Sequence, residues 1–434
     1  MELPRGFPNT GVWCWVNSLL QAFAGISDPL WWEIIGREPL ANDLLAALAA
    51  ALVWVNRGCA AGNTAPGRLM QDLQRALVLE CGLSASAEQD VHEALVNVLE
   101  SIYVGLLWRC RKFAMVSSLR APWAPLRPWL PGLSLRWAAA VSGLRAFTLL
   151  WEGTLEECRD CVECGLRKLD RSEGRQAFRC LSLSLPPLEF IGDVESQLHG
   201  AYAGGESERL EGVDCARCSL KASISSFRYE AARGSWAALR ACGFLQRLAA
   251  LGGSAPEASK LRDLCPMGSP APVRRCTTQR RNFRIVKAPR VLALQLRRLT
   301  FGPMGATKSN QRVAFPASLG MPLGGAEEKI LQERNFVLQA VVSHFGTAFS
   351  GHFLCHRRWA GVAAAEGDAA LRVSRALLSP GALVMPGWAA SLGRSSGRRM
   401  RPWLRANDDC VAPSSESEVL RYPGAYILFY ETSL

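Results

Sequence analysis

The chain contains no long hydrophobic run. Its longest unbroken apolar stretch, Leu44 to Val55, has 12 residues, whereas a helix that spans a membrane needs about 20. The apolar stretch from Leu133 to Trp151 is interrupted by Arg136 and Arg145. We therefore expect no membrane span, and we expect the first stretch to form a buried helix.

We also expect no secretory leader, because the first residues of the sequence lack a charged start followed by an apolar core. The 15 cysteines are an odd number, and several occur in C-x-x-C pairs. This usage disfavours a disulfide framework and favours free thiols or a metal site in a reducing compartment. These features predict a cytoplasmic protein.

No single basic run dominates the sequence, although the formal net charge is +12. A charge of this size is compatible with binding to nucleic acid or to an anionic membrane surface. The basic residues are mostly arginines and are scattered along the chain, so a solvated surface also explains the charge. We favour that interpretation and expect no nucleic-acid partner.

The length and the hydrophobic pattern together indicate the fold class. A chain of 434 residues exceeds the size at which single cores stop growing, so several packed subregions are expected. Residues 17–117 carry apolar stripes with helical spacing, and Ser84 or Ser86 is a candidate cap for the stripe over Gln89–Leu99. From Leu181 onward, short apolar runs of strand length take over. This order predicts an α+β fold.

The clearest strand candidates are three short apolar runs, Val291–Leu296, Phe336–Val342 and Ala425–Tyr430. Two other stretches, 222–275 and 361–401, are interpreted as insertions because of their loop-like composition, the first being rich in Ala, Gly and Arg. We expect both insertions to be partly mobile surface segments.

Three residues far apart in the sequence have the order of a thiol acyl-transfer site. Cys14 precedes an apolar stripe near the N-terminus, His352 follows a glycine hundreds of residues later, and Asn407 lies downstream of that histidine. A cysteine at a helix N-terminus is stabilised as a thiolate by the helix dipole. Taken singly, Cys14 could be a buried structural cysteine and His352 an ordinary strand histidine. The remaining histidines lack such a context: His92, His199, His344 and His356.

Residues 6–21 read G-F-P-N-T-G-V-W-C-W-V-N-S-L-L-Q. This segment resembles, without gaps, the cysteine box of the ubiquitin-specific proteases, G-L-x-N-x-G-N-T-C-[YF]-M-N-S-x-L-Q. Members of that family are papain-like cysteine peptidases that remove ubiquitin from proteins. The resemblance extends to Glu431 and implies a helical thumb (about 1–150), fingers (about 151–290) and a β-rich palm (about 291–434).

The resemblance also implies the roles of the site residues. Cys14 matches the nucleophile, His352 the general acid and base, and Asn407 the residue that orients the imidazole. Asn9 falls at the family's oxyanion-hole position, five residues before the nucleophile. Asp408 matches a second acidic residue that assists.

The family pattern is broken immediately before the nucleophile, where Val12 and Trp13 replace Asn-Thr. The leading interpretation is a thiol-dependent deubiquitinase that hydrolyses the isopeptide bond after the C-terminal glycine of ubiquitin. The alternative is a catalytically weak or inactive ubiquitin-binding scaffold of the same fold. A basic, zinc-containing nucleic-acid binder is a third reading, but no recognition module supports it.

Residues 88–95 read E-Q-D-V-H-E-A-L and resemble the family's Q-Q-D-x-x-E-F box. Asp90 and Glu93 are three residues apart, which places them on one face of a helix. In the family these carboxylates bind arginines of the C-terminal tail of ubiquitin, a task for which Arg–carboxylate pairs are suited. The implied partners are ubiquitin and ubiquitinated proteins. The alternative is an ordinary solvated helical face.

Two C-x-x-C pairs indicate a metal site. Cys161 and Cys164 form the first pair, and Cys215 and Cys218 form the second, and 50 residues separate the two pairs. Two such pairs can make a tetrahedral zinc site. Such a site is structural rather than catalytic, because four thiolates leave no open coordination position on the metal. In the family these pairs lie at the tip of the fingers. Cys158 with Cys161 is an overlapping alternative pair, and four reduced structural cysteines without metal are the other alternative.

A few residues are similar to the mitochondrial outer-membrane branch of the family, namely Leu299, Ser350 and the pair Arg357–Arg358. An anchor helix like that of the branch is not recognisable, and Asn407 is not its typical third residue. We expect a cytoplasmic protein, with the nucleus or the mitochondrial surface as alternatives.

Overall fold

The computed structural model describes residues 4–9, 11–37, 42–57, 65–84, 89–118, 131–169, 175–185, 192–203, 208–250, 260–303, 305–324, 332–359 and 401–433. Within these residues, six helices precede the first strand, as the hydrophobic pattern predicts, and the later helices lie between strands. The helices are α1 (Cys14–Gly25), α2 (Pro29–Arg37), α3 (Asp43–Arg57), α4 (Pro66–Cys81), α5 (Val91–Ser118), α6 (Pro131–Trp151), α7 (Val194–Tyr202), α8 (Ala216–Ala232), α9 (Trp236–Ala250), α10 (Leu261–Leu264) and α12 (Glu416–Arg421).

The strands form two larger sheets and a separate hairpin. They are β1 (Gly153–Cys161), β2 (Arg167–Leu169), β3 (Arg175–Phe178), β4 (Leu181–Ser184), β5 (Glu208–Asp214), β6 (Cys276–Lys287), β7 (Val291–Arg297), β8 (Leu299–Gly302), β9 (Gly305–Lys308), β10 (Ser318–Leu323), β11 (Gln332–Gly346), β12 (Gly351–Arg358), β13 (Trp403–Asn407), β14 (Cys410–Ser414) and β15 (Ala425–Thr432).

The eight-stranded sheet has the order β14-β13-β12-β11-β15-β7-β4, with β10 also paired to β11. All its pairs are antiparallel except β4 with β7, which is parallel. The three strands expected from short apolar runs are its central members, β7, β11 and β15, so those predictions are confirmed. Their residues are buried on both faces, which explains why the runs are continuous rather than alternating.

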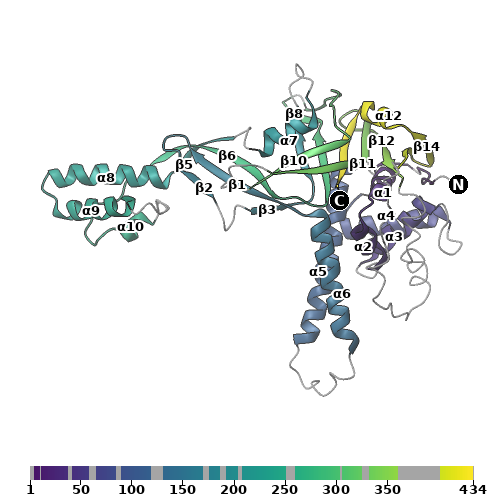
Figure 1. The fold of residues 1–434 in the computed structure, drawn as a ribbon, viewed down its shortest axis with the longest axis horizontal. Coiled ribbons are helices and arrows are strands. Elements are labelled where there is room, and N and C mark those ends of the chain that lie inside the picture. Colours follow the sequence, from purple (N-terminus) through teal and green to yellow (C-terminus); the bar gives the residue numbers. More distant parts are fainter. Residues whose placement is uncertain are drawn as a thin grey trace.

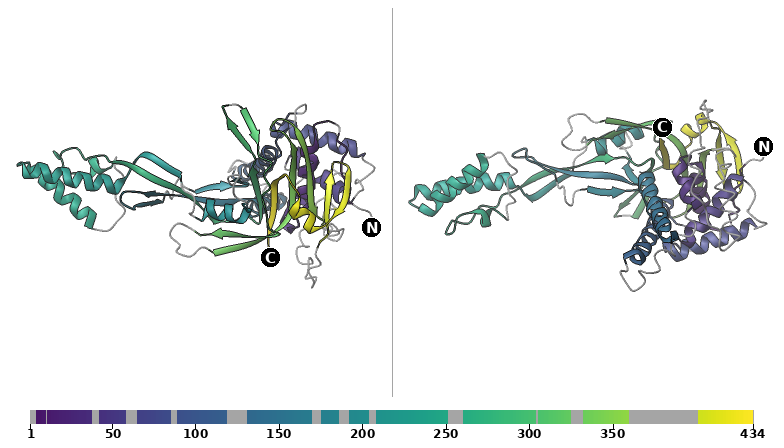
Figure 2. Two further views of the ribbon diagram at one scale, coloured as in Figure 1. Left: turned by 90° about the horizontal axis from the view of Figure 1, so that it is seen from above. Right: turned by 60° about the horizontal axis from the view of Figure 1, so that its bottom comes forward.

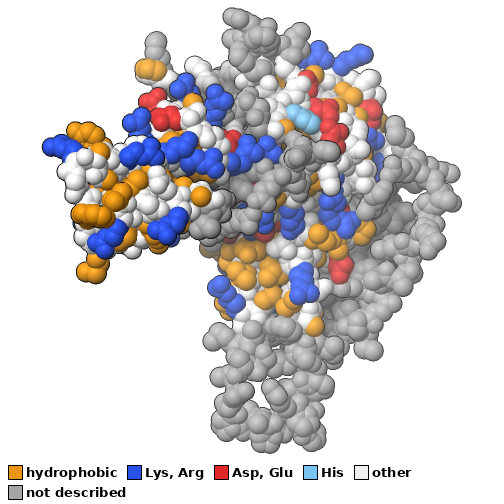
Figure 3. All heavy atoms as spheres, turned by 60° about the vertical axis from the view of Figure 1, so that its left-hand side comes forward, with side chains coloured by type: hydrophobic (Ala, Val, Ile, Leu, Met, Phe, Trp, Pro, Cys, Tyr) orange, Lys and Arg blue, Asp and Glu red, His pale blue; other side chains and the backbone are white. Residues whose placement is uncertain are grey.

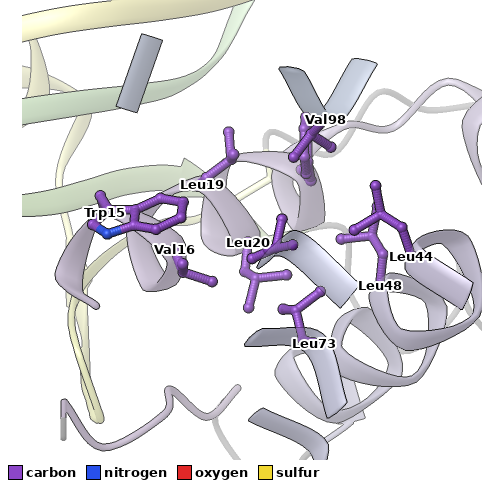
Figure 4. A pocket seen from close by; sticks show the side chains of 10 residues that line it. Trp15, Val16, Leu19, Leu20, Leu44, Leu48, Leu73 and Val98 are labelled. Carbon is purple, nitrogen blue, oxygen red and sulfur yellow. The ribbon is translucent and has the colours of Figure 1, made fainter. Parts of the chain in front are cut away.

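Helix α1 is enclosed between the other helices and this sheet (Figure 1). All its residues are buried, and it packs against β12, β11 and α3. Figure 4 shows Trp15 and Leu20 of α1 turned toward Leu44, Leu73 and Val98 of the surrounding helices. The cavity between them has a volume of about 10 Å³, which is at most the room of one water molecule. This apolar face therefore anchors α1 and offers no ligand site.

The five-stranded sheet, in which β2, β1, β6 and β5 follow one another and β3 pairs with β1, carries the fold away from this core. Figures 1 and 2 show it extending to one side and ending at α8, α9 and α10, while α5 and α6 project together in another direction. The apolar stretch Leu44–Val55 lies within α3, as predicted for a buried helix. Within the described residues, we find no helix that is both long and apolar enough to cross a membrane.

The insertion expected over 222–275 is not an irregular segment. Most of it forms α8, α9 and α10, which bury a small core of their own that includes Leu220, Phe227 and Leu245. Its alanines, taken as a loop-like composition, are instead good helix formers. The second expected insertion, 361–401, lies almost wholly outside the described residues.

Candidate active site

Cys14 is the first residue of α1, and its residue is only 4% exposed. Trp13 precedes the helix without providing a side-chain cap, and the first turn contains no acidic residue. The positive end of the helix dipole is therefore not offset by a local carboxylate in that turn, and it stabilises negative charge on the sulfur. The local structure is that expected of a nucleophilic thiol.

Asn9 lies beside this helix start. Its Oδ1 accepts a hydrogen bond from the backbone N–H of Trp13 at 3.3 Å. The NH₂ group of the same side chain takes no part in this bond and is a donor for other groups. Trp13 is 6% exposed as a residue, and its ring stacks on Trp15 with a centroid distance of 5.3 Å. The bulky residue that departs from the family pattern thus packs into the core beside Trp15.

His352 and Asn407 meet across two neighbouring strands. His352 is the second residue of β12 and Asn407 the last of β13, and the imidazole Nε2 lies 2.6 Å from Asn407 Oδ1. An amide oxygen only accepts, so Nε2 carries the proton and Nδ1 is left free to act as a base. Gly351 is required here, because a Cβ at this position would lie 2.3 Å from Nε2 of His344.

Asp408 connects this histidine to the helix that carries the cysteine. It occupies the turn between β13 and β14 with a φ of 52°. Its Oδ1 accepts a hydrogen bond from Asn17 Nδ2 at 2.8 Å, and its Oδ2 lies 3.8 Å from Nε2 of His352. Asn17 is one helical turn after Cys14. Asn17 lies within the cysteine box, and its i+3 spacing from the cysteine is the sequence signal that could have indicated a role in the site.

The N-terminal segment is held against the same turn. The side chain of Asn17 also donates to the Phe7 carbonyl at 3.1 Å, and Gln21 donates to the Arg5 carbonyl at 3.1 Å. Gly6 passes so close to the turn that a Cβ would lie 1.7 Å from the Asp408 carbonyl oxygen. These contacts fix the extended segment that leads from Arg5 to Phe7 against the turn at Asp408.

Two other histidines are close to this region in the sheet but have different surroundings. His344 stacks on Phe353 at 4.3 Å, and burial together with the charge of Lys308 lowers its pKa to about 4. His356 is fully buried beside Tyr422, and burial lowers its pKa to about 4 as well. Both are therefore neutral at pH 7. His352, whose side chain is 40% exposed, is the accessible one.

Asp90 caps helix α5. Its Oδ1 accepts the backbone N–H groups of His92 at 2.7 Å and Glu93 at 3.3 Å, and its Oδ2 accepts the hydroxyl of Tyr426. The predicted helix start at Ser84 or Ser86 is thus wrong: the helix begins at Val91, because Asp90 satisfies its first N–H groups. Ser84 lies in the preceding loop, and Ser86 is outside the described residues.

Glu93 is exposed in the first turn of α5. Asp90 precedes the helix as its cap, and its carboxylate is bound by two backbone N–H groups and by Tyr426. The carboxylate of Glu93, in contrast, faces solvent. The Tyr426 contact was not foreseen, because this residue lies 336 positions away in the sequence. Burial, followed by the charge of Asp90, raises the pKa of Tyr426, so its hydroxyl stays protonated as the donor.

The four predicted metal ligands come together at the far end of the five-stranded sheet. The sulfur atoms of Cys161, Cys164, Cys215 and Cys218 all lie within 4.8 Å of one another. Cys161 and Cys218 are separated by 3.8 Å, and Cys164 and Cys215 by 3.5 Å. The overlapping alternative is excluded, because Cys158 is buried but does not belong to this group. A group of this kind could hold a metal ion.

The thiols of the group differ in acidity. Burial raises the pKa of Cys215 to about 11 and also raises that of Cys218. Burial acts in the same direction on Cys161, but hydrogen bonds from Thr277 and from the neighbouring cysteines outweigh it and lower the pKa to about 6. A cation would be needed to hold all four as thiolates at these separations.

Comparison with known proteins agrees with this geometry. The family described as ubiquitin carboxyl-terminal hydrolase matches residues 5–430, and the chain therefore belongs to that family. Ubiquitin carboxyl-terminal hydrolase 11 of Schizosaccharomyces pombe is 30% identical over 346 residues, which are 79% of this chain and 71% of that protein. Ubiquitin carboxyl-terminal hydrolase 16 of Emericella nidulans is 29% identical over 211 residues, which are 48% of this chain and 31% of that protein. The chain thus spans about a third of that second relative.

Solved structures share the fold. A SAGA Ubp8/Sgf11/Sus1/Sgf73 DUB module bound to ubiquitin aldehyde aligns with a TM-score of 0.58 and 17% identity, over 99% of this chain and 70% of that chain. A second module of this kind, Ubp8(C146A) bound to monoubiquitin, aligns with a TM-score of 0.56 and 17% identity, over 100% of this chain and 72% of that chain. The predicted α+β, papain-like fold of a ubiquitin-specific protease is thereby confirmed.

The roles of the two carboxylates at the start of α5 can be separated by stability measurements. Replacing Asp90 with Ala removes a helix cap, which costs about 1 kcal/mol, and also leaves the Tyr426 hydroxyl without its acceptor. Replacing the exposed Glu93 with Ala should change the free energy of unfolding by less than about 0.5 kcal/mol. Urea denaturation followed by tryptophan fluorescence measures both. Equal effects of the two substitutions would contradict the capping role.

Proposed function

We propose that this protein is a thiol-dependent deubiquitinase that hydrolyses the isopeptide bond after the C-terminal glycine of ubiquitin. The observation that carries the proposal is the contact of 2.6 Å between His352 Nε2 and Asn407 Oδ1. This contact is linked through Asp408 and Asn17 to the helix that begins at Cys14. Membership of the ubiquitin carboxyl-terminal hydrolase family supports the choice of substrate.

In the proposed mechanism, Nδ1 of His352 takes the proton of the Cys14 thiol, and the thiolate attacks the isopeptide carbonyl carbon. The carbonyl π electrons move to the oxygen, where the Asn9 side-chain NH₂ and the Cys14 backbone N–H stabilise the oxyanion. One such donor contributes about 3–4 kcal/mol to lowering the barrier. When the C–N bond breaks, the protonated His352 gives its proton to the leaving lysine amine.

The resulting thioester joins Cys14 to the ubiquitin C-terminal glycine. His352, now neutral, accepts a proton from water as the water attacks the thioester carbonyl carbon. Collapse of the second tetrahedral intermediate breaks the C–S bond, and the thiolate leaves as the ubiquitin carboxylate forms. Asn407 keeps Nε2 protonated throughout, so that Nδ1 remains the atom that exchanges protons.

For substrate binding, we propose that Glu93 and Asp90 interact with arginines of the ubiquitin tail. Glu93 is the more available of the two, because it is exposed and its oxygens can accept both N–H groups of an arginine side chain. Asp90 is already held by Tyr426 and by two backbone N–H groups. A carboxylate has about four lone-pair sites, so a further arginine contact remains open to it.

The alternative is a weakly active or inactive ubiquitin-binding scaffold, and one observation favours it. Val12 and Trp13 stand where the family has Asn-Thr, next to the nucleophile. Trp13 is buried against Trp15, which supports accommodation of the change in the core rather than obstruction of the thiol. A covalent probe built on the ubiquitin C-terminus separates the two readings, because only the enzyme forms an adduct at Cys14.

Replacing Cys14 with Ala should abolish turnover of ubiquitin-rhodamine and adduct formation with the probe. Ubiquitin binding should persist, because a thiol supplies chemistry but little contact area. The matched control is Cys81→Ala, since burial raises the pKa of Cys81 to about 12 and such a thiol is unreactive. If Cys14→Ala retained turnover, another residue would have to be the nucleophile. An unmodified wild-type protein that still binds ubiquitin would establish the scaffold reading.

Asn407 and Asp408 should be partly redundant in orienting His352, because their oxygens lie 2.6 Å and 3.8 Å from the same Nε2. His352→Ala should lower turnover by about 10²–10⁴-fold, and Asn407→Ala or Asp408→Ala by less. The double variant should lose more, in free energy, than the sum of the single losses. The exposed neighbour Asp409 provides the control Asp409→Ala. Additive losses in the double variant would argue against redundancy.

We propose zinc as the metal of the four-cysteine group, with a structural role. A Zn–S bond of about 2.3 Å implies sulfur separations of about 3.8 Å in a tetrahedron. The separations of 3.8 Å for Cys161–Cys218 and 3.5 Å for Cys164–Cys215 support this fit. When bound, the ion would hold two segments of the chain together and would contribute folding free energy.

Replacing Cys215 and Cys218 with Ser should release about one equivalent of zinc and lower the melting temperature, because structural zinc stabilises the folded state directly. The matched control is Cys158→Ser, which alters a buried cysteine on the same strand as Cys161 but outside the group. Elemental analysis of the purified proteins measures the metal. A wild-type protein purified without chelators that contains no zinc would rule out the assignment.

We propose ubiquitin and ubiquitinated proteins as the partners. A nucleophilic thiol and a four-cysteine metal site both require reduced cysteines, which supports a reducing compartment such as the cytoplasm. Direct turnover of ubiquitin-rhodamine by the wild-type protein is the first experiment, because it tests the reaction and the modifier together.

A further inference from the structure

Helices α8, α9 and α10, with the connecting residues up to Arg275, form a projection that we call the arm (residues 216–275). Figure 1 shows the arm at the far end of the five-stranded sheet, pointing away from both chain termini. The described part of the arm, 216–250 and 260–275, packs around its own apolar core. The mechanism proposed above uses none of its residues, and Cys218 is the one member of the four-cysteine group that belongs to it.

The arm carries most of the excess positive charge of the chain. Residues 216–275 contain ten Lys and Arg and three Asp and Glu, a net charge of +7 in a protein whose total is +12. The basic residues are spread over sixty positions, which is why they form no run in the sequence. Folding gathers them on one projection.

The basic residues lie on the solvent side of both longer helices. On α8, Arg217, Lys221 and Arg228 are exposed at positions i, i+4 and i+11, which form a single stripe. On α9, Arg240 and Arg247 are exposed and seven residues apart. Other faces of the two helices supply the core of the arm through Leu220, Phe227, Ala238, Ala241, Cys242 and Leu245.

Large apolar side chains stand among these charges. Trp236 is 76% exposed at the start of α9, and Leu239 next to it on the same face is 51% exposed. Tyr229 near the end of α8 is 64% exposed, with the Arg233 guanidinium 5.7 Å from its ring centroid. Figure 3, in which the arm comes toward the viewer, shows apolar and basic side chains intermixed over its surface.

We propose that the arm docks on an anionic lipid surface, with its tip inserted at the depth of the headgroups. Basic residues are attracted to anionic phospholipids, while Trp and Tyr prefer the boundary between headgroups and acyl chains. A helix that combines Lys and Arg with Trp and Leu is typical of such interfacial binding.

Nucleic acid is the competing polyanion, and the apolar residues argue against it. Phosphates would engage the arginines, and bases can stack on Trp236 or Tyr229, but an aliphatic side chain such as Leu239 gains nothing from a phosphate backbone. The projecting, convex shape of the arm in Figures 1 and 2 suits insertion into a flat surface better than enclosure of a strand. This inference is independent of the proposed reaction, because it concerns residues outside the active site.

The test is co-sedimentation of the full chain with vesicles, in the absence of ubiquitin. Vesicles of phosphatidylcholine alone are compared with vesicles containing 30 mol% phosphatidylserine, a composition of about the charge found in cytoplasmic leaflets. We expect binding to the anionic vesicles and little to the neutral ones. Binding should weaken as the salt concentration rises, because screening shortens the reach of the surface potential.

Arg240→Gln with Arg247→Gln should weaken partitioning by about 25-fold, or about five-fold for each charge removed. The matched control is Arg68→Gln with Arg75→Gln, since these two arginines are also exposed and seven residues apart on a helix, α4, outside the arm. Thermal unfolding checks that all variants remain folded. Equal weakening by both pairs, or equal binding to both kinds of vesicle, would overturn the proposal.

Trp236 and Leu239, at the start of α9, are the apolar residues that we expect to insert. The double variant Trp236→Ala with Leu239→Ala, the tip variant, should weaken partitioning of the protein onto anionic vesicles without changing its charge. Its control is Trp108→Ala with Leu79→Ala, because these residues are 59% and 71% exposed on α5 and α4. Unchanged partitioning of the tip variant would overturn insertion. A labelled oligonucleotide is assayed in parallel. If the arm arginines govern its binding while no vesicle binding occurs, the arm is a nucleic-acid surface and the proposal fails.

Discussion

The hydrogen bonds along the polar side of α1 determine how the active site is assembled. The helix is buried on every side, and apolar contacts alone leave its rotation about its own axis loosely defined, because they are not directional. Asn17 and Gln21 lie one and two turns beyond Cys14, and both make directional bonds. Asn17 binds the turn at Asp408, and Gln21 accepts a hydrogen bond of 2.7 Å from the buried Arg357. These bonds set the direction in which the cysteine faces.

Three groups of the described cysteines differ in their surroundings. Cys14 stands at the positive end of a helix with no acid in the first turn. Cys355 is buried and Cys180 is half-buried. Burial raises the pKa of each to about 12, so neither is a nucleophile at neutral pH. The four clustered cysteines depend on one another, because only a shared cation allows all of them to ionise.

Sequence reasoning identified the parts of the molecule whose signals are local. The central strands β7, β11 and β15 were predictable because they are continuous apolar runs, and the cysteine box because its register is continuous. The start of α5 was mispredicted. Serine and aspartate are both good helix caps, so the sequence does not decide between Ser84, Ser86 and Asp90, and the fold shows that Asp90 is the cap. The link from Asn17 to Asp408 joins residues 391 positions apart. No local pattern reports such a contact.

The junction between the metal group and the arm has a mechanical consequence. Cys215 precedes α8 directly and Cys218 lies in its first turn. The same two side chains belong to the four-cysteine group, so this group also fixes the direction in which the helix leaves the sheet. A helix of 17 residues is about 25 Å long at 1.5 Å per residue. A tilt of about 10° at the cysteines would therefore swing the distal end by about 4 Å. The rigidity of the four-cysteine group therefore determines how precisely the distal end of the arm is positioned relative to the rest of the molecule.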